Sequence, residues 1–280
     1  MLKLSVFILC VCGFIGLSPQ SYAEQSSYPE TLPDDPRKIR TATSPEWLEA
    51  IGRFVSKTSD TTMEQCSLNL IADQPGKDGI IAVTAGHCID HWASYEGGFL
   101  IEQNEVVFKS NSGKLIQREI VAILKSEMNP GDYAIVKLNA PIKNVDIKPL
   151  LNAPYDYFDL LDEDMFGEKF KPYATMAGFS ADKGLGGKGK VMTYDERCRL
   201  YGGASGRKQG FCYSYQGASG GAVAVTVALG DMADETWQVS VQSYFVGSIV
   251  GARGGDDNSK TLFTETTHYT RILDHILASH

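Results

Sequence analysis

TAGHC at residues 84–88 places His87 directly after a run of buried-strand character and directly before a cysteine. Two later stretches also set a polar residue among apolar or glycine neighbours. GDYAIVKL at 131–138 has Asp132 at the mouth of an apolar strand, and GASGG at 217–221 has Ser219 in a glycine-rich turn. Each stretch alone has an ordinary structural explanation, because aspartates begin strands and glycine-rich segments form loops. Together they supply a base, an acid and a hydroxyl, the groups that nucleophilic catalysis requires.

Outward from these stretches the chain is a succession of short runs rich in Val, Ile, Tyr and Thr. The runs are 51–55, 67–71, 80–84, 105–108, 120–124, 133–138, 174–178, 191–194, 221–229, 237–241 and 245–250. Many short strands at close spacing predict a barrel or a sandwich rather than alternating strands and helices. One helix is predicted at 269–279, where apolar residues recur on a single face.

The strands fall into two groups of similar size, because a segment rich in Asp and Tyr at 152–168 lies between them. We therefore predict an all-β protein made of two antiparallel β-barrels and a C-terminal α-helix. The first barrel would span 47–151 and carry the histidine and the aspartate. The second would span 169–266 and carry the serine, and the helix would occupy 267–280.

The composition is that of an acidic globular protein. The chain has 280 residues and a formal net charge of −8, and 43% of its residues are hydrophobic and 21% charged. This balance excludes a disordered polyampholyte. It also argues against nucleic acid as a partner, because there is no basic excess to bind a phosphate backbone.

The N-terminus has the parts of a secretory signal peptide: Lys3, an apolar run at 4–17, and the small-x-small sequence Ser21-Tyr22-Ala23. The run is shorter than the roughly 20 residues that a membrane-spanning helix needs. We expect residues 1–23 to be removed and the protein to be secreted or periplasmic, a monomer without a stable membrane anchor. Residues 24–46 contain several prolines and almost no apolar periodicity, which predicts a pro-segment or an extended N-terminal arm.

Four cysteines remain after residue 23: Cys66, Cys88, Cys198 and Cys212. An even number in an oxidising compartment predicts two disulfides, for which three connectivities are possible. Pairing of neighbours, Cys66 with Cys88 and Cys198 with Cys212, is favoured because it closes the shortest loops. No C-x-x-C pair is present, so a structural zinc site is not expected.

In the order His–Asp–Ser, the three opening stretches resemble the T-A-[AG]-H-C, D-[IY]-A-[IL] and G-x-S-G-G boxes of the chymotrypsin/trypsin-like serine peptidases. The resemblance covers residues 47–280 and is nearest to the bacterial, glutamyl-endopeptidase-like branch. The half-cystine strand at 66–71 and the strand at 246–250 also look like those of the family.

The resemblance implies a serine endopeptidase that acts on proteins or peptides without a cofactor or metal. Ser219 would attack the scissile carbonyl, His87 would take and return the proton, and Asp132 would orient the imidazole. The backbone N–H groups of Gly217 and Ser219 would form the oxyanion hole. The half-cystine before the histidine would bridge to the one that follows it.

Two other functions fit part of the sequence pattern. GASGG also fits the G-x-S-x-G elbow of α/β-hydrolases, for which Asp256 and His268 could complete a triad. That esterase fold needs a helix after the serine, whereas residues 222–227 are β-branched and predict a strand. A catalytically inactive relative, kept as a binding protein, is the second alternative, although such proteins usually lose a triad residue and this chain retains all three.

Three further patterns predict no site. Residues 184–190 match G-x-x-x-x-G-K, but Val191 replaces the hydroxyl residue that binds Mg²⁺, so a surface loop is expected. His87 and His91 lack the glutamate of an H-E-x-x-H zinc motif. The acidic residues at 159–164 are interpreted as a solvated linker rather than a calcium site.

The resemblance also bears on specificity and activation. Counting back six residues from Ser219 gives Tyr213 at the position expected for the base of the specificity pocket. Counting two residues on from Gly247 gives Ile249 at the position of a histidine in the glutamyl-specific branch. Neither offers a charge, which predicts a neutral pocket, although Arg253 could reach in and favour acidic groups. Ala218 offers no carboxylate to a new N-terminal amine, and residues 37–40, Arg-Lys-Ile-Arg, form a plausible trimming site.

Overall fold

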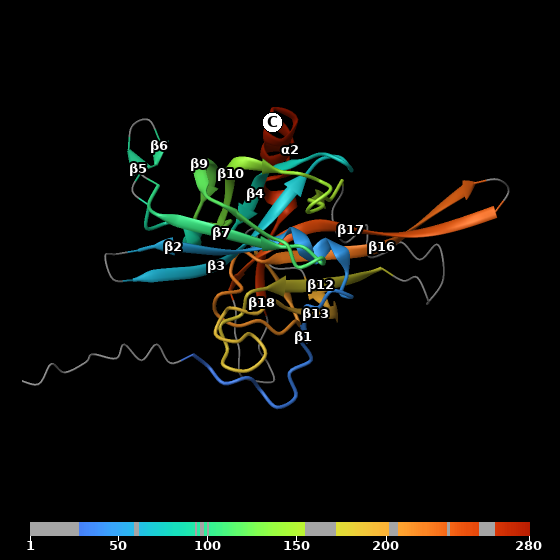
Figure 1. The fold of residues 1–280 in the computed structure, drawn as a ribbon, viewed down its shortest axis with the longest axis horizontal. Helices are drawn as coiled ribbons and strands as arrows, with labels where there is room; N and C mark the ends of the chain where they lie inside the picture. The colour runs from blue at the N-terminus through green and yellow to red at the C-terminus, as the bar shows by residue number, and fades with distance from the viewer. Residues whose placement is uncertain are drawn as a thin grey trace, which may run out of the picture.

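The computed structural model of the protein describes residues 28–58, 62–92, 94–95, 98–99, 101–154, 172–201, 207–233, 236–251 and 261–280. The predicted signal peptide, Arg253, Asp256 and the acidic residues at 159–164 lie outside these ranges. The described chain is mostly β-strand with a C-terminal helix, as the sequence predicted (Figure 1).

The first barrel is closed by a bent strand. Its members are β2 (Ile51–Lys57), β3 (Met63–Ala72), β4 (Gly79–Thr84), β7 (Asn104–Lys109), β8 (Leu115–Arg118), β9 (Ile120–Glu127) and β10 (Tyr133–Ile142). Only Glu119 separates β8 from β9, yet β8 pairs with β7 while β9 pairs with β10. The chain therefore passes from one edge of the curled sheet to the other and removes both edges.

The second barrel is closed in the same way. It contains β12 (Tyr173–Gly178), β13 (Thr193–Cys198), β14 (Leu200–Tyr201), β15 (Arg207–Gly210), β16 (Ala222–Ala233), β17 (Thr236–Gly251) and β18 (Thr261–Glu265). Arg199 alone separates β13, which pairs with β12, from β14, which pairs with β15. The hairpin of β16 and β17 extends well beyond the body of the molecule (Figure 1).

One short strand joins the two barrels. β11 (Leu150–Asn152) is parallel to β3 of the first barrel and to β17 of the second. The two antiparallel barrels agree with the prediction, and this parallel bridge, which the sequence did not indicate, makes one continuous sheet of both halves. The remaining short strands are β1 (Lys38–Ile39), paired with β13, and the small hairpin of β5 (Ser94–Tyr95) and β6 (Gly98–Phe99).

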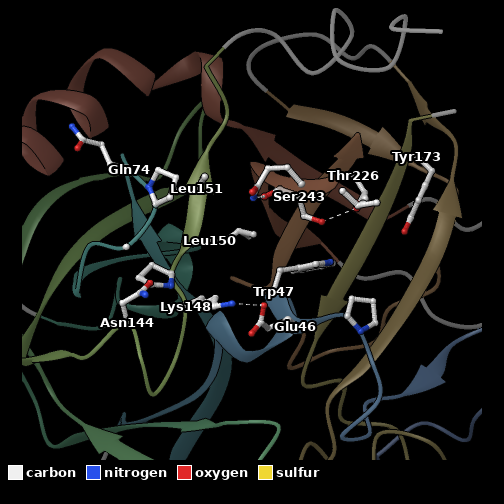
Figure 2. Close-up of a pocket in the computed structure, with 16 residues that line it drawn as sticks. Glu46, Trp47, Gln74, Asn144, Lys148, Leu150, Leu151, Tyr173, Thr226 and Ser243 are labelled. Carbon is white, nitrogen blue, oxygen red and sulfur yellow. Dashed lines mark hydrogen bonds and ion pairs between the residues drawn. The ribbon is translucent and has the colours of Figure 1, made fainter. Parts of the chain in front are cut away.

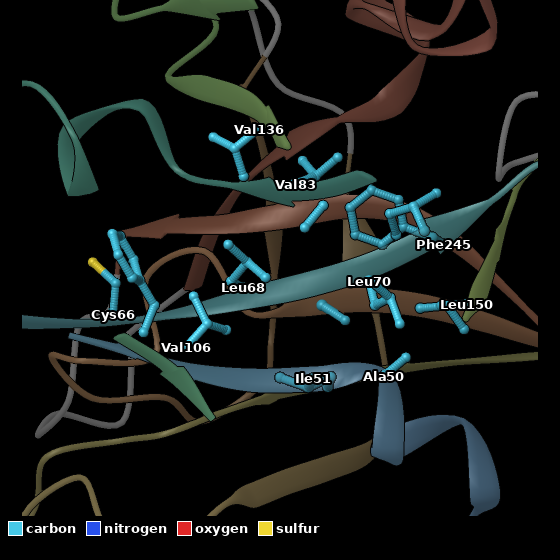
Figure 3. Close-up of a cluster of buried hydrophobic side chains, with 14 of the residues drawn as sticks. Ala50, Ile51, Cys66, Leu68, Leu70, Val83, Val106, Val136, Leu150 and Phe245 are labelled. Atoms are coloured by element: carbon cyan, nitrogen blue, oxygen red, sulfur yellow. The ribbon is translucent and has the colours of Figure 1, made fainter. Parts of the chain in front are cut away.

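The core of the first barrel fills the space that these strands enclose. Buried side chains from β2, β3, β4, β7 and β10 meet there, and Phe245 of β17 reaches the same cluster (Figure 3). Ile51, Leu68 and Val83 are 0% exposed. Strand register is set by this inward face, since a shift of one residue would expose it.

The C-terminal helix α2 (Thr270–Ala278) packs on the first barrel. Leu273 and Leu277 are buried in the first-barrel cluster, and the Lys77 ammonium donates a hydrogen bond to the Leu277 carbonyl. A 3₁₀ turn (Thr266–His268) precedes the helix. Neither α2 nor any other helix in the described part of the chain is long and apolar enough to cross a membrane.

Candidate active site

His87 and Asp132 are brought together by neighbouring strands. His87 lies in a 3₁₀ turn (Gly86–Cys88) directly after β4, and Asp132 directly precedes β10, which pairs with β4. The Asp132 carboxylate accepts a hydrogen bond from the His87 backbone N–H at 2.9 Å. It also lies 3.1 and 3.2 Å from the ring Nδ1. These contacts fix the imidazole with its Nε2 edge directed away from the carboxylate.

The surroundings raise the pKa of His87. Burial by itself would lower the pKa, but the hydrogen bond and negative charge of Asp132 outweigh it, with smaller contributions from Glu64 and Asp90. The His87 side chain remains 30% exposed, whereas that of Asp132 is 8% exposed. A partly accessible imidazole over a buried carboxylate is suited to exchanging a proton with a bound molecule.

An arginine that the sequence did not single out adjoins this pair. Arg207, at the start of β15, has its guanidinium Nη2 3.8 Å from the Asp132 carboxylate. It donates hydrogen bonds to the backbone carbonyls of Pro130 and Met128, at 3.1 and 3.3 Å. Arg207 therefore holds the segment before Asp132.

Two consecutive tight turns present Ser219. The Ala218 N–H donates to the Tyr215 carbonyl at 3.0 Å, and the Gly221 N–H donates to the Ala218 carbonyl at 2.8 Å. The third residue of each turn, Gly217 and Gly220, has a φ of +90° and +79°. Type II turns require a positive φ at this position, which glycine adopts without steric cost. The residues 215–221 are called the serine loop below.

The serine loop is attached to the first barrel beside the strand that carries His87. The Ser67 N–H on β3 donates to the Ser219 carbonyl at 2.7 Å, and the Asn69 side chain donates to the Gly220 carbonyl at 2.7 Å. A Cβ atom at Gly220 would overlap the Ser67 carbonyl and the Thr84 hydroxyl. The glycine is therefore required for this approach, which sets Ser219 close to the end of β4.

The backbone N–H groups of Gly217 and Ser219 remain available as donors. Among the described residues, neither N–H donates a hydrogen bond. The carbonyls on either side are engaged, because Gly217 accepts from the Ser67 hydroxyl at 3.1 Å and Ser219 accepts from the Ser67 N–H. Fixed carbonyls beside unpaired N–H groups are the arrangement that an oxyanion site requires.

The two residues predicted for a specificity pocket differ in exposure. Tyr213 is half-buried, and its N–H donates to the buried Asp195 carboxylate at 2.9 Å. Burial raises the pKa of Asp195 despite that hydrogen bond. Ile249 is 0% exposed, and its carbonyl accepts a hydrogen bond from the Gly220 N–H. Ile249 thus packs behind the serine loop.

Both cysteine pairs lie at disulfide distance. The sulfur atoms of Cys66 and Cys88 are 2.00 Å apart, and those of Cys198 and Cys212 are 1.91 Å apart. The first pair ties β3 to the residue after His87. The second links the bend between β13 and β14 to the segment before Tyr213.

The described residues hold two groups of candidate metal ligands, and both depend on these cysteines. One group joins His87 to the first cysteine pair, and the other joins Asp195 to the second. Sulfur atoms in a disulfide are not thiolates, which are the form that binds metal. His91 lies 3.9 Å from Glu64 and belongs to neither group.

A cavity of about 560 Å³ opens elsewhere, between the two barrels. Trp47, Leu150 and Leu151 form its apolar wall, and a Glu46–Lys148 ion pair and a Thr226–Ser243 hydrogen bond lie on its sides (Figure 2). His87, Asp132 and Ser219 do not line it, so this cavity is separate from the candidate active site.

Comparison with known proteins places the fold. No protein-family model matches the chain, and no curated protein sequence does either. Among solved structures, a thermostable serine protease from an extremophilic microorganism has a TM-score of 0.52 and 13% sequence identity, with 84% of this chain and 100% of that one covered. A Glu endopeptidase has a TM-score of 0.52 and 14% identity, with coverages of 89% and 99%. The chain has the chymotrypsin-like fold.

The chymotrypsin-like fold also occurs without activity. A scabies mite inactivated protease paralogue has a TM-score of 0.52 and 12% identity to this chain, with coverages of 87% and 99%. The fold therefore assigns no activity by itself, and the residues at the site must carry that argument.

Proposed function

We propose that the protein is an exported serine endopeptidase that hydrolyses peptide bonds through Ser219, His87 and Asp132. The hydrogen-bonded His87–Asp132 pair, with the serine loop attached beside β4, is the observation that carries the proposal. The base and the group that orients it come from separate elements, and the serine loop that carries the candidate nucleophile is hydrogen-bonded to Ser67 and Asn69 of the neighbouring strand.

The chemistry follows from these positions. His87 removes the proton from the Ser219 hydroxyl as the oxygen attacks the carbonyl carbon, and Asp132 stabilises the imidazolium that results. The N–H groups of Gly217 and Ser219 donate to the oxyanion. His87 then gives its proton to the leaving amine, and an acyl-enzyme remains. Water repeats the sequence to release the acid and restore Ser219.

Export is part of the proposal. A disulfide pair in each barrel favours an oxidising compartment, either the periplasm or the outside of the cell. The signal-like residues at 1–23 supply the route.

A neutral specificity pocket is proposed because Tyr213 offers no charge to a substrate side chain, and because Ile249, buried behind the serine loop, stands where the glutamyl-specific branch has a histidine. We expect small or medium uncharged residues to be preferred before the scissile bond. Profiling with a peptide library varied at that one position tests this, and a dominant preference for Arg, Lys or Glu would contradict it.

The two alternative functions, an esterase and an inactive binding protein, explain fewer of the structural features. An esterase of the α/β-hydrolase type requires a helix after Ser219, where the structure has β16, and its candidate His268 instead binds Glu127 at 2.8 Å. An inactive binding protein is favoured only by the likeness to the inactivated paralogue.

Labelling with a fluorophosphonate probe tests the proposal. Wild-type protein should be modified at Ser219 and should cleave peptide substrates. Ser219→Ala should lose labelling and reduce kcat by roughly six orders of magnitude, since triad residues act as a unit. Unlabelled, inert wild-type protein with the expected fold would favour the binding protein, and full activity in Ser219→Ala would exclude this serine.

A further inference from the structure

The N-terminal segment 28–40, called the strap below, is built into the second barrel. It belongs to residues 24–46, for which the sequence predicts a pro-segment or an extended arm with a plausible trimming site at 37–40. In the structure, Lys38 and Ile39 form β1, which pairs with β13. The Pro29 carbonyl accepts a hydrogen bond from the Lys183 N–H at 2.9 Å.

A buried arginine anchors the strap. The Arg37 guanidinium binds the Asp35 carboxylate at 2.6 Å and the Asp182 carboxylate at 2.9 Å, and all three side chains are at most 2% exposed. It also donates to the Thr193 hydroxyl at 3.2 Å. In the described part of the chain, no other cation forms an ion pair with either carboxylate. Both negative charges therefore depend on Arg37 for compensation.

Asp182 belongs to a loop, 179–192, that supports the serine loop. The Ala181 N–H donates to the Gln216 carbonyl at 2.6 Å, and the Ser180 hydroxyl accepts from the Tyr215 N–H at 3.2 Å. The Phe179 carbonyl lies against Gly217, where an added Cβ would meet it. This support loop thus contacts three consecutive residues of the serine loop, Tyr215, Gln216 and Gly217.

The strap also contacts the serine loop directly. The Arg37 guanidinium lies over the Tyr215 ring, 4.3 Å from its centroid. The Tyr215 hydroxyl accepts a hydrogen bond from the Leu32 N–H at 3.1 Å. Tyr215 is the first residue of the turn that presents Gly217, so its ring and hydroxyl connect Arg37 to the backbone of that turn.

We propose that the strap is a permanent part of the working enzyme and that Arg37 is a positioning residue, which orders the serine loop through Asp182 and Tyr215. The inference rests on the proposed peptidase function. It deepens that function by naming the charge that organises the oxyanion donors. That charge is the internal Arg37 guanidinium rather than a new N-terminal amine created by cleavage. Cleavage within 37–40 would then inactivate the enzyme rather than activate it.

The test compares Arg37→Met and Arg37→Lys with Lys38→Met in the full exported chain. Lys38 is the matched control because it is the next residue of the strap, and its ion pair with Glu196 is partly exposed. Arg37→Met should slow fluorophosphonate labelling and kcat roughly 10- to 100-fold with little change in KM, because oxyanion donors are misplaced. Arg37→Lys should recover part of the loss, and Lys38→Met should match the wild type.

Hydrogen exchange supplies a readout that does not need activity. In Arg37→Met, amides of 179–192 and of the serine loop should exchange faster, while those of β9 and β10 should not change. Unaltered exchange in the serine loop, or wild-type labelling rates in Arg37→Met, would overturn the inference. If wild-type protein is not labelled, the proposed function fails and the exchange experiment still decides the role of the strap.

Sequencing the N-terminus of active enzyme tests the same inference without a variant. Labelled protein isolated from its producer should begin before Arg37. A labelled, fully active form that begins after Arg40 would contradict a permanent strap.

Discussion

The position of the His87 proton decides the lower pH limit of the proposed reaction. His87 must be neutral to act as a base, and its pKa is raised above the ordinary value of about 6.5 because Asp132 outweighs burial. Activity should therefore fall as the pH drops through a midpoint above 6.5. A profile of kcat/KM between about pH 5 and pH 9 measures this midpoint.

Replacing Asp132 by Asn should move that midpoint in a known direction. The charge that raises the pKa of His87 is removed while burial remains, so the acidic limb should shift to lower pH. The turnover number should fall roughly 10⁴-fold, because the amide no longer selects the required tautomer. Glu127→Gln is the control, since Glu127 binds His268 rather than His87. A limb that moves to higher pH in Asp132→Asn would contradict this account.

At the level of single residues, the sequence identified residues that stand within short contiguous motifs and missed residues whose partners lie far away in sequence. His87, Asp132 and Ser219 each stand in a recognisable box, so the sequence alone predicts them as site residues. Arg207 and Arg37 lie in no box. Arg37 meets Asp182 across 145 residues of sequence, and a pairing that distant leaves no local pattern.

Among the elements, the two disulfides should contribute similarly to stability but differently to catalysis. They close loops of 22 and 14 residues, and the chain-entropy estimate gives about 3 kcal/mol of unfolding free energy for each. Only Cys66–Cys88 includes the neighbour of His87. Removing either disulfide should therefore lower the free energy of unfolding by a similar amount, whereas the effects of the two removals on catalysis should differ.

Double Cys→Ala variants of each pair test this difference. Removing Cys66 and Cys88 should lower kcat, because the 3₁₀ turn that carries His87 is no longer tied to β3. Removing Cys198 and Cys212 should chiefly raise KM, because that pair precedes Tyr213. Urea unfolding gives the stability change, and steady-state kinetics on the folded variants give the rest. Equal kcat losses in both variants would contradict the assignment.

Strand prediction succeeded where strands are buried and apolar. The runs that became β3, β4, β10 and β12 have core side chains and were identified from composition. β8, with the sequence LIQR, and β15, with RKQG, were missed because polar side chains give them no apolar run. β17 was split into two predicted runs, yet it is continuous because Gln242–Tyr244 keeps pairing with β16.

Across the whole molecule, each end of the chain is attached to the barrel that lies farther away in sequence. The strap precedes the first barrel but binds the second, and α2 follows the second barrel but packs on the first (Figure 1). Stacking of Tyr269 on Tyr133, with ring centroids 4.2 Å apart, secures the start of the helix. Sequence patterns predicted the helix and the two barrels, but not this exchange, because docking depends on surfaces that only the folded barrels create.

The crossed attachment of the ends has a consequence for the order in which the protein can be completed during its synthesis. The strap is made before both barrels, whereas Asp182 and Tyr215, which hold Arg37, are made only with the second. The first barrel is finished by β10, but its covering helix follows the second barrel. Under the proposed function, a nascent chain that crosses a membrane would lack an assembled hydrolytic centre until the second barrel and α2 had followed the first barrel. The proposed export would thereby keep the producing cell from contact with the active enzyme.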